Sequence, residues 1–333
     1  MTEPARAGRL KLLKGAVKWV VGLVALGFCI YAVKRYWHDF QKEARPDISE
    51  LRLVLGVVCI VASYTGQAFG WMLLLAGLGN RLRLYTALRA WCYSQVGKYV
   101  PGKVVAFLVR ARAAEEDGAL PSKVFATCVL EILVSLVVAS SVWLLSLAIV
   151  PGATPLEGRY QLLSLVPLPF AIASLHPRII NWVMGLYYRW RKMPESEVPA
   201  LKLTDMLKAG GAYFVAWSFY GLGGYFILTS VIDLNSPGAL TTFGVVGAFL
   251  FSWAVGYMML ISPGGLGFRE GALTFALGAW LTTGTGAVVA ALARLCQSGT
   301  ELALAGIFWL AHQIVSRRMG KPRKSDESQH PSS

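Results

Sequence analysis

The chain has few of the residues that build catalytic and metal centres. It contains only four histidines and five cysteines among 333 residues. The histidines are scattered, and no two cysteines have the Cys-x-x-Cys spacing of zinc or redox sites. Neither a Ser-His-Asp nor a Cys-His arrangement can be assembled. These absences argue against hydrolase, metal and disulfide chemistry, so we expect a protein that binds no cofactor and is not an enzyme.

Charge is also scarce, and acidic residues are scarcer than basic ones. Only 15% of residues are charged, with 32 Lys and Arg against 18 Asp and Glu, which gives a formal net charge of +14. In a soluble protein this excess would suggest nucleic-acid binding. Here 55% of residues are hydrophobic and the mean hydropathy is +0.53. The basic residues lie at the ends of apolar stretches, as the positive-inside rule describes. We therefore expect an all-α, polytopic membrane protein that binds no nucleic acid.

The apolar stretches predict the membrane-spanning helices. A helix needs about 20 residues to cross a hydrocarbon core of about 30 Å. We expect about eight spans, some of them short, near residues 16–33, 51–79, 123–150, 160–175, 206–232, 240–261, 268–281 and 287–315. Pro167 and Pro169 are expected to kink the fourth span. Residues 178–192 mix aromatic and basic side chains and are expected to lie in the headgroup layer.

The ends of the chain predict its orientation. Residues 1–15 are basic, and the first apolar stretch is followed by Lys34-Arg35-Tyr36-Trp37 rather than by a cleavage site. We therefore expect a cytoplasmic N-terminus and a retained first span. A transmembrane domain over residues 16–316 is then followed by residues 317–333, a basic stretch rich in serine that we expect to be a disordered cytoplasmic tail.

Two stretches interrupt the apolar pattern. Residues 97–103 read Gly-Lys-Tyr-Val-Pro-Gly-Lys, and residues 262–271 read Ser-Pro-Gly-Gly-Leu-Gly-Phe-Arg-Glu-Gly. Lipid cannot satisfy the free N–H and C=O groups of such backbone, so it must be buried in protein or line a watery cavity. Because the acidic run 115–117 follows the first interruption, residues 84–112 are expected to form a re-entrant hairpin with both ends in the cytoplasm. We predict that the two interruptions meet within the bilayer and form a binding site.

Ionisable residues within apolar stretches support this prediction. An acidic residue follows each interruption in the next long helix, Glu131 after the first and Glu301 after the second. This correspondence suggests an internal repeat, and transporters built from repeats hold substrates between paired interrupted helices. Arg294 and Glu301 are seven residues apart, so they share one helix face. The alternative is that these charges have a structural role. They would form pairs between helices, with Glu131 neutralising Arg269, Arg294 or Lys103. Otherwise, Lys98 and Lys103 would extend to the membrane interface.

Two sequence patterns have simpler explanations than the motifs they resemble. Gly97-x-x-x-x-Gly102-Lys103 is close to a phosphate-binding P-loop, but Val104 replaces the Ser or Thr that would reach Mg²⁺, and no strand precedes it. An ATPase is therefore not expected. Gly66-x-x-x-Gly70 allows another helix to approach closely, and we expect that helix to belong to the same chain.

The two interruptions resemble the lysylphosphatidylglycerol synthase transmembrane region, also called the flippase-like domain family, over about residues 15–316. In multiple peptide resistance factors a similar domain is implied to move aminoacylated phosphatidylglycerol across the membrane, joined to a cytoplasmic aminoacyltransferase domain. The short sequence after Val315 leads us to expect a stand-alone relative in the inner membrane of a bacterium. The resemblance singles out Pro101, Gly102, Lys103, Pro263, Gly264, Gly265, Gly267, Arg269, Glu270 and Gly271.

Our first hypothesis is a lipid translocator, a flippase or scramblase, that binds the headgroup of an anionic phospholipid or polyprenyl-phosphate lipid. The expected binding residues are Lys98, Pro101, Gly102, Lys103, Glu131, Pro263, Gly264, Gly265, Gly267, Arg269, Glu270, Arg294 and Glu301. The alternative is a non-transporting accessory subunit of a membrane glycosyltransferase or lipid synthase. A lipid-modifying enzyme is a third hypothesis and would need a carboxylate such as Glu131, Glu270 or Glu301.

Overall fold

A computed structural model describes residues 27, 30–31, 34–38, 40–45, 47–98, 104–151, 158–190, 200–234, 238–259 and 262–319. These residues form helices joined by loops, and no β-strand occurs among them. The predicted all-α membrane class is confirmed. Most of the expected first span and residues 320–333 of the expected tail lie outside the described residues.

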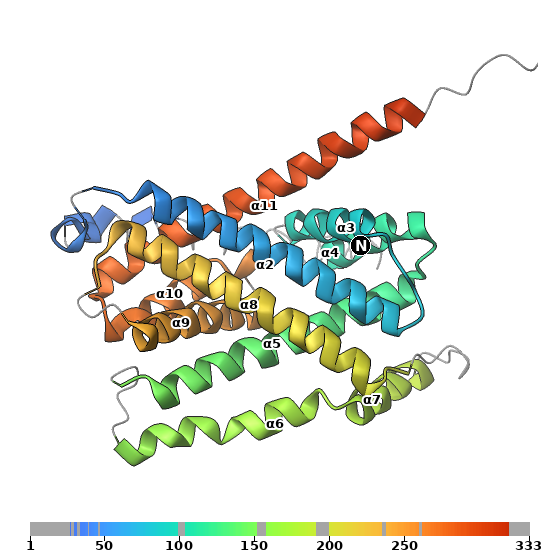
Figure 1. Ribbon diagram of the computed structural model, residues 1–333, viewed down its shortest axis with the longest axis horizontal. Coiled ribbons are helices and arrows are strands. Elements are labelled where there is room, and N and C mark those ends of the chain that lie inside the picture. Colours follow the sequence, from blue (N-terminus) through green and yellow to red (C-terminus); the bar gives the residue numbers. More distant parts are fainter. Residues whose placement is uncertain are drawn as a thin grey trace, which may run out of the picture.

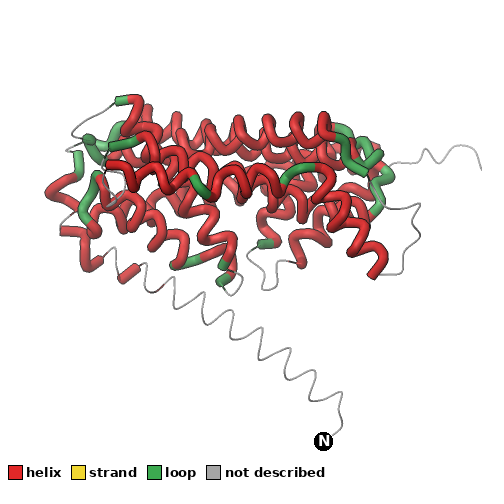
Figure 2. Tube along the Cα trace, turned by 90° about the horizontal axis from the view of Figure 1, so that it is seen from below, coloured by secondary structure: helices red, strands yellow, loops and turns green. Residues whose placement is uncertain are grey.

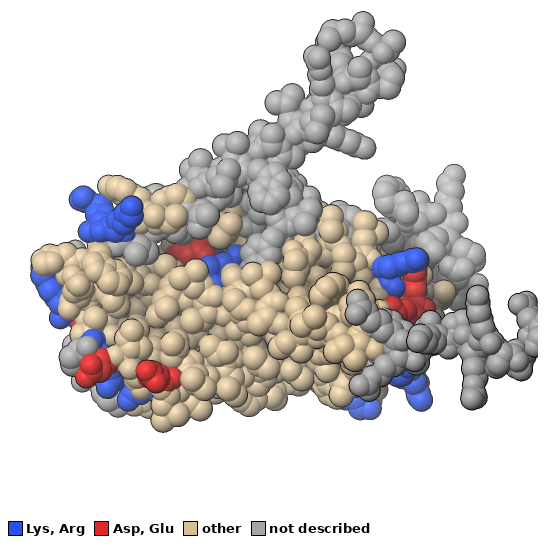
Figure 3. Space-filling model, turned by 90° about the horizontal axis from the view of Figure 1, so that it is seen from above, with Lys and Arg blue, Asp and Glu red and all other residues tan. Residues whose placement is uncertain are grey.

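Five helices are long and apolar enough to cross a membrane: α2 (Glu50–Gly77), α5 (Pro121–Ile149), α8 (Leu203–Val231), α9 (Ala239–Met258) and α11 (Thr283–Met319). They run lengthwise through the molecule (Figure 1), and most loops lie at its two ends (Figure 2). Many charged side chains gather toward the same ends and leave a broad belt with few charged residues between them (Figure 3). This distribution is the one expected of a bundle that crosses a bilayer along its long axis.

A sixth crossing depends on a bent segment. The elements η2 (Gly158–Leu165), α6 (Pro167–Ser174) and α7 (Pro177–Trp190) follow α5, and the axes of residues 162–174 and 177–186 meet at 61°. Helix α6 begins at Pro167, and α7 begins at Pro177. Helix α7 is amphipathic, with Ile180 and Met184 buried and Trp182 exposed, and its position in the headgroup layer stays a prediction.

The described residues hold five or six crossings, fewer than the eight expected. Part of the difference is that residues 16–33 lie mostly outside the described residues. The other part is the segment predicted to cross at 268–281. Its α-helix, α10 (Phe268–Ala276), has only nine residues, so it is about 14 Å long at 1.5 Å per residue and cannot cross the hydrocarbon core.

The first interruption forms a helical hairpin, as predicted, and its entry and exit on one side of the membrane stay a prediction. Helix α3 (Leu84–Gly97) and helix α4 (Val104–Ala114) pack against each other, and η1 (Glu115–Asp117) follows α4. At the open end, an ion pair of 2.6 Å joins Arg83 Nη2 to Asp117 Oδ1, so both ends of the hairpin lie together. Near its tip, a Cβ on Gly97 would lie 2.8 Å from Ala106 Cα, which shows how closely the two helices approach.

The second interruption returns the chain along α9. After α9, the short helix η4 (Pro263–Gly265) leads into α10 and then into η5 (Leu277–Ala279). Arg269 lies against Gly256 near the end of α9, and Trp280 lies against Gly244 near its beginning. The segment therefore runs antiparallel to α9 over about twelve residues and brings the chain back to the start of α11.

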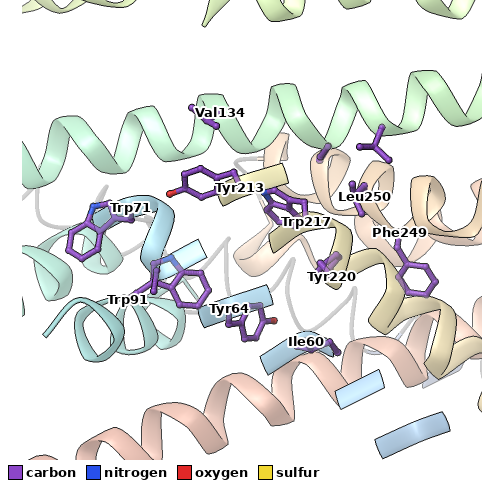
Figure 4. Close-up of a cluster of buried hydrophobic side chains, with 14 of the residues drawn as sticks. Ile60, Tyr64, Trp71, Trp91, Val134, Tyr213, Trp217, Tyr220, Phe249 and Leu250 are labelled. Atoms are coloured by element: carbon purple, nitrogen blue, oxygen red, sulfur yellow. The ribbon is translucent and has the colours of Figure 1, made fainter. Parts of the chain in front are cut away.

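Small residues allow α2 and α8 to pack closely. A Cβ on Gly66 would lie 2.9 Å from Ala216 Cβ, and one on Gly70 would lie 2.8 Å from the Tyr213 ring. The Gly66-x-x-x-Gly70 face is therefore covered within the chain, as predicted. Beside this contact, large aromatic side chains form the centre of the core, with Trp71 and Tyr64 from α2, Trp91 from α3, and Tyr213, Trp217 and Tyr220 along α8 (Figure 4).

Candidate functional site

The tip of the α3–α4 hairpin and the glycine-rich turn before α10 line the same cavity. Lys98 and Ala106 come from the hairpin, and Gly264 and Gly265 come from the turn. The cavity has a volume of about 110 Å³. One water needs about 10–15 Å³ of such space, so the cavity has room for several waters or a small polar group. The described parts of the two interruptions thus meet, in agreement with the sequence prediction.

The cavity lies half-way along the helices that surround it. Tyr64 is at the middle of α2, Glu131 lies near the middle of α5, Trp217 is at the middle of α8, and Glu301 is at the middle of α11. These helices have 28 to 37 residues each. Their midpoints correspond to the depth at which transporters with interrupted helices hold substrate. A small group of basic and acidic side chains appears within the belt that otherwise has few charged residues (Figure 3).

On one side of the cavity, the hairpin is bonded to α11. Lys98 Nζ lies 2.5 Å from Glu301 Oε1, and the same carboxylate oxygen accepts a hydrogen bond of 2.8 Å from Tyr64 Oη. Glu301 is 3% exposed, whereas the Lys98 side chain is 25% exposed. The Lys98 ammonium therefore pairs with a buried carboxylate, which excludes the alternative that it simply extends to the membrane interface.

A second ion pair joins the hairpin to α5. Arg110 Nη1 donates to Glu131 Oε2, and Trp91 Nε1 donates to Glu131 Oε1 at 2.8 Å. Arg110 Nη2 also donates to Ser94 Oγ at 2.9 Å, and its guanidinium lies 4.8 Å from the Trp71 ring centroid. Neither Arg269 nor Arg294, two of the cations expected to neutralise Glu131, is its ion-pair partner among the described residues, and the third, Lys103, lies outside them. The partner is Arg110, which lies near the end of the segment 84–112 that was predicted to form the hairpin.

The second interruption contributes Arg269. Its guanidinium lies 5.5 Å from the Tyr220 ring centroid, and Nη2 donates to Gln297 Oε1. Gln297 Nε2 in turn donates to Tyr220 Oη at 2.6 Å, so the amide and the ring orient the guanidinium together. Arg269 is 8% exposed. No ion pair to Arg269 occurs in the part of the chain that the structure describes.

Arg294 and Glu270 hold the turn rather than line the cavity. Arg294 Nη2 donates to the Gly264 carbonyl at 2.8 Å, and its Nε lies 3.6 Å from Glu270 Oε1. Glu270 Oε2 accepts a hydrogen bond of 2.6 Å from the Gly267 N–H at the start of α10. Glu270 thus lies at the N-terminus of α10, and its charged partner is Arg294 rather than Arg269. The two residues line a small adjoining cavity of about 10 Å³.

The glycines of the turn are required by its backbone. Gly264, Gly265 and Gly267 have φ values of +61°, +72° and +83°, a region that other residues rarely adopt. A Cβ on Gly265 would also lie 2.5 Å from the Gly256 carbonyl oxygen. The Gly-Gly-Leu-Gly sequence therefore specifies a tight turn that packs directly on the backbone of α9.

A comparison with known protein families identifies the family of this chain. The family description "Lysylphosphatidylglycerol synthase TM region" matches residues 15–305. The chain belongs to this family. The match covers α2 to most of α11 and therefore includes both interruptions and every described residue of the cavity wall. A search of curated proteins found no match.

In this member of the lysylphosphatidylglycerol synthase transmembrane family, the predicted site residues fall into three groups. Lys98, Glu131, Gly264, Gly265, Arg269 and Glu301 line the cavity. Gly267, Glu270 and Arg294 support the turn. Pro101, Gly102 and Lys103 lie outside the described residues, as does the side chain of Pro263.

The sequence prediction missed several members of the cavity wall, chiefly Arg110, Tyr64, Trp91 and Tyr220. Gln297, which orients Arg269, was also missed. The aromatic residues lie in helices whose composition resembles that of any buried apolar helix. Usable signals existed for Gln297, a polar residue between Arg294 and Glu301 in the stretch 287–315, and for Arg110, a charged residue directly after the apolar residues 104–109.

Proposed function

We propose that the protein is a lipid translocator that binds an anionic headgroup in the cavity between the hairpin tip and the turn before α10. Phosphatidylglycerol and a polyprenyl-phosphate lipid are the two candidate substrates. Family membership supports a flippase-like role, and the position of the cavity half-way along the helices supports a headgroup in transit. The protein would act on the lipid without changing it chemically.

The charges of the cavity wall carry this proposal. Lys98 is paired with Glu301, and Arg110 is paired with Glu131. Arg269 lines the same wall without an ion pair to a described carboxylate. An isolated buried cation is costly, because burial removes its hydration. A phosphate that entered the cavity would supply the missing counter-charge and accept hydrogen bonds from the guanidinium in a forked geometry.

The alternative, a non-transporting accessory subunit, has lost part of its support. The Gly66/Gly70 face could have served as a contact surface for a partner, but α8 of the same chain covers it. The amphipathic helix α7 remains available to a partner. Stable co-purification of a glycosyltransferase or lipid synthase, without translocation in its absence, would favour this alternative.

Proteoliposomes test the proposal. The purified protein is reconstituted with phosphatidylglycerol or a polyprenyl-phosphate lipid labelled on its acyl or prenyl chain, and the rate of exchange between leaflets is measured. We expect exchange with the intact chain and a loss of roughly tenfold or more for Arg269→Ala, because a hydrogen-bonded charge is removed. Arg112→Ala is the matched control, since this arginine side chain is 86% exposed and should leave the rate unchanged.

The variants must be shown to fold before their rates are compared. Equal elution in size exclusion and an equal unfolding midpoint establish this for Arg269→Ala, and Arg269→Lys should keep part of the rate because the charge remains. Equal exchange by folded Arg269→Ala and the intact chain would reject the proposed site. Absence of exchange by the intact chain, for both lipids, would reject translocation.

A further inference from the structure

The wall of the cavity also contains three aromatic side chains from α8 and α9. Trp217 of α8 and Trp253 of α9 have ring centroids 4.0 Å apart, and Trp253 and Tyr257 stack at 5.2 Å. All three residues line the cavity. We call these three side chains the aromatic wall. Flat apolar faces with polar edges suit the ring or chain of a neutral, hydroxyl-bearing group, whose C–H groups pack on the rings.

The aromatic wall lies beside the Arg269 side chain. The Arg269 side chain packs on Tyr220 of α8 and against Gly256 of α9. Trp217 comes three residues before Tyr220, and Trp253 comes three residues before Gly256. Residues three apart in a helix share a face. Helices α8 and α9 run antiparallel, since Trp217 packs on Trp253 and Gly224 packs on Phe249, so the two tryptophans lie at a level between Tyr220 and Gly256. A group held by Arg269 therefore has the aromatic wall beside it.

One donor of this wall has no partner. Trp217 Nε1 is buried and makes no hydrogen bond to any described residue. Trp217 as a whole is 1% exposed. A buried N–H without an acceptor is unfavourable, because it has lost its hydrogen bonds to water. An oxygen of a ligand in the cavity would satisfy it.

The carboxylates of the cavity are already engaged. Glu131 accepts from both Arg110 and Trp91, and Glu301 accepts from both Lys98 and Tyr64. Among the described lining residues, three cations face two carboxylates. A ligand ammonium would therefore have to displace an existing cation or stay beside Arg269 unpaired. Either arrangement is unfavourable, since like charges at contact repel strongly in a desolvated site.

We infer that the cavity selects a phosphate headgroup whose far end is a neutral hydroxyl-bearing group, glycerol or a sugar, and discriminates against one that ends in an ammonium group. This inference rests on the proposed function for the view that the ligand is a lipid headgroup. The phosphate lies at Arg269, and an oxygen of the neutral group accepts from Trp217 Nε1. The protein would thus disfavour lysyl-phosphatidylglycerol, the lipid in its family's name.

Binding of short-chain lipids to the detergent-solubilised protein tests this selectivity directly. The probes are phosphatidylglycerol, a prenyl phosphate carrying one hexose, phosphatidic acid and lysyl-phosphatidylglycerol, all at one ionic strength. We expect at least one hydroxyl-bearing probe to bind about tenfold or more tightly than lysyl-phosphatidylglycerol. Whichever of phosphatidylglycerol and the hexose-bearing prenyl phosphate binds more tightly shows whether the neutral group is glycerol or a sugar. Equal or tighter binding of lysyl-phosphatidylglycerol, or no binding of any probe, would overturn the inference.

Trp217→Phe tests the unpartnered donor, because it keeps an aromatic ring and removes the indole N–H together with one of the two fused rings. We expect the substitution to weaken binding of the preferred hydroxyl-bearing probe roughly two- to tenfold. The affinity for phosphatidic acid, which lacks the neutral group, should stay unchanged. An unchanged ratio of the two affinities, in a variant that unfolds at the same midpoint, would show that Trp217 does not contact the neutral group.

Failure of the inference and failure of the proposed function give different results. Translocation is measured in proteoliposomes, whereas selectivity is measured by binding in detergent. Exchange of phosphatidylglycerol together with equally tight lysyl-phosphatidylglycerol binding would retain the translocator and reject the selectivity. Selective binding without exchange would retain the selectivity and reject translocation.

Discussion

Lys98 and Glu301 are 203 positions apart in the sequence, yet their side chains meet at 2.5 Å. Lys98 directly follows α3 at the tip of the hairpin, and Glu301 is at the middle of α11. The pair therefore fixes the depth to which the hairpin enters the bundle. It also closes one side of the cavity that contains Arg269.

The first prediction concerns this pair. Lys98→Glu places a second carboxylate beside Glu301, and we expect the free energy of unfolding to fall by about 3 kcal/mol, because a largely buried charge loses its partner. The swapped variant Lys98→Glu/Glu301→Lys should recover a large part of that loss. Unfolding in detergent micelles measures both. A swapped variant no more stable than Lys98→Glu would show that the pair does not contribute to stability.

Arg110 and Glu131 provide the second prediction. Both side chains are at least nine-tenths buried, so Arg110→Met leaves the Glu131 carboxylate without its cation. We expect a loss of about 3–5 kcal/mol in unfolding free energy. Arg110→Met/Glu131→Gln removes the charge as well and should be the more stable of the two variants. If the double variant is the less stable one, the ion pair is not the main contribution of these residues.

The third prediction concerns the turn before α10. Gly265→Ala places a Cβ on a residue with φ of +72° and against the Gly256 backbone. The backbone conformation alone costs about 1–3 kcal/mol, and the contact adds to it, so a clearly lower unfolding midpoint and loss of lipid exchange are expected. Gly271→Ala is the matched control, because a Cβ there meets nothing within 4 Å. Equal effects of the two substitutions would contradict the role of the turn.

The sequence predicted the long helices and both interruptions because their signals are local. A run of apolar residues indicates a span wherever it packs, and proline with glycine interrupts a helix in any context. The hairpin followed from the acidic segment 115–117, which cannot lie in lipid. The segment 268–281 was wrongly predicted to cross, because that prediction rested on the even number of crossings that two cytoplasmic ends require, and such a count does not say how far α10 extends along α9.

The partners of the buried charges could not be predicted in the same way. Arg110 and Arg112 are two residues apart in α4, and both lie near the end of the segment 84–112 that was predicted to form the hairpin. Successive side chains in a helix are separated by about 100°, so these two point to nearly opposite sides. The Arg110 side chain is 6% exposed and reaches Glu131, whereas that of Arg112 is 86% exposed. Which side faces the bundle is decided by packing between helices that are distant in sequence.

The orientation of the hairpin gives the last prediction. Arg81 and Glu115 are exposed residues beside its two ends, and Pro151 is exposed just after α5. In a variant without native cysteines, a cysteine at each position is treated with a membrane-impermeant maleimide. The re-entrant form places the first two on one side and the third on the other, and the basic residues near position 81 predict that the shared side is the cytoplasm.

Labelling in vesicles of known orientation separates the outcomes. We expect Arg81→Cys and Glu115→Cys to react in inside-out vesicles and Pro151→Cys to react in right-side-out vesicles. If Arg81→Cys and Glu115→Cys react from opposite sides, α3 and α4 cross the membrane together as one span. That span would separate Arg83 from Asp117, whose ion pair of 2.6 Å holds the two ends together. In that arrangement, Lys98 and Arg110 would enter the cavity from opposite sides of the membrane.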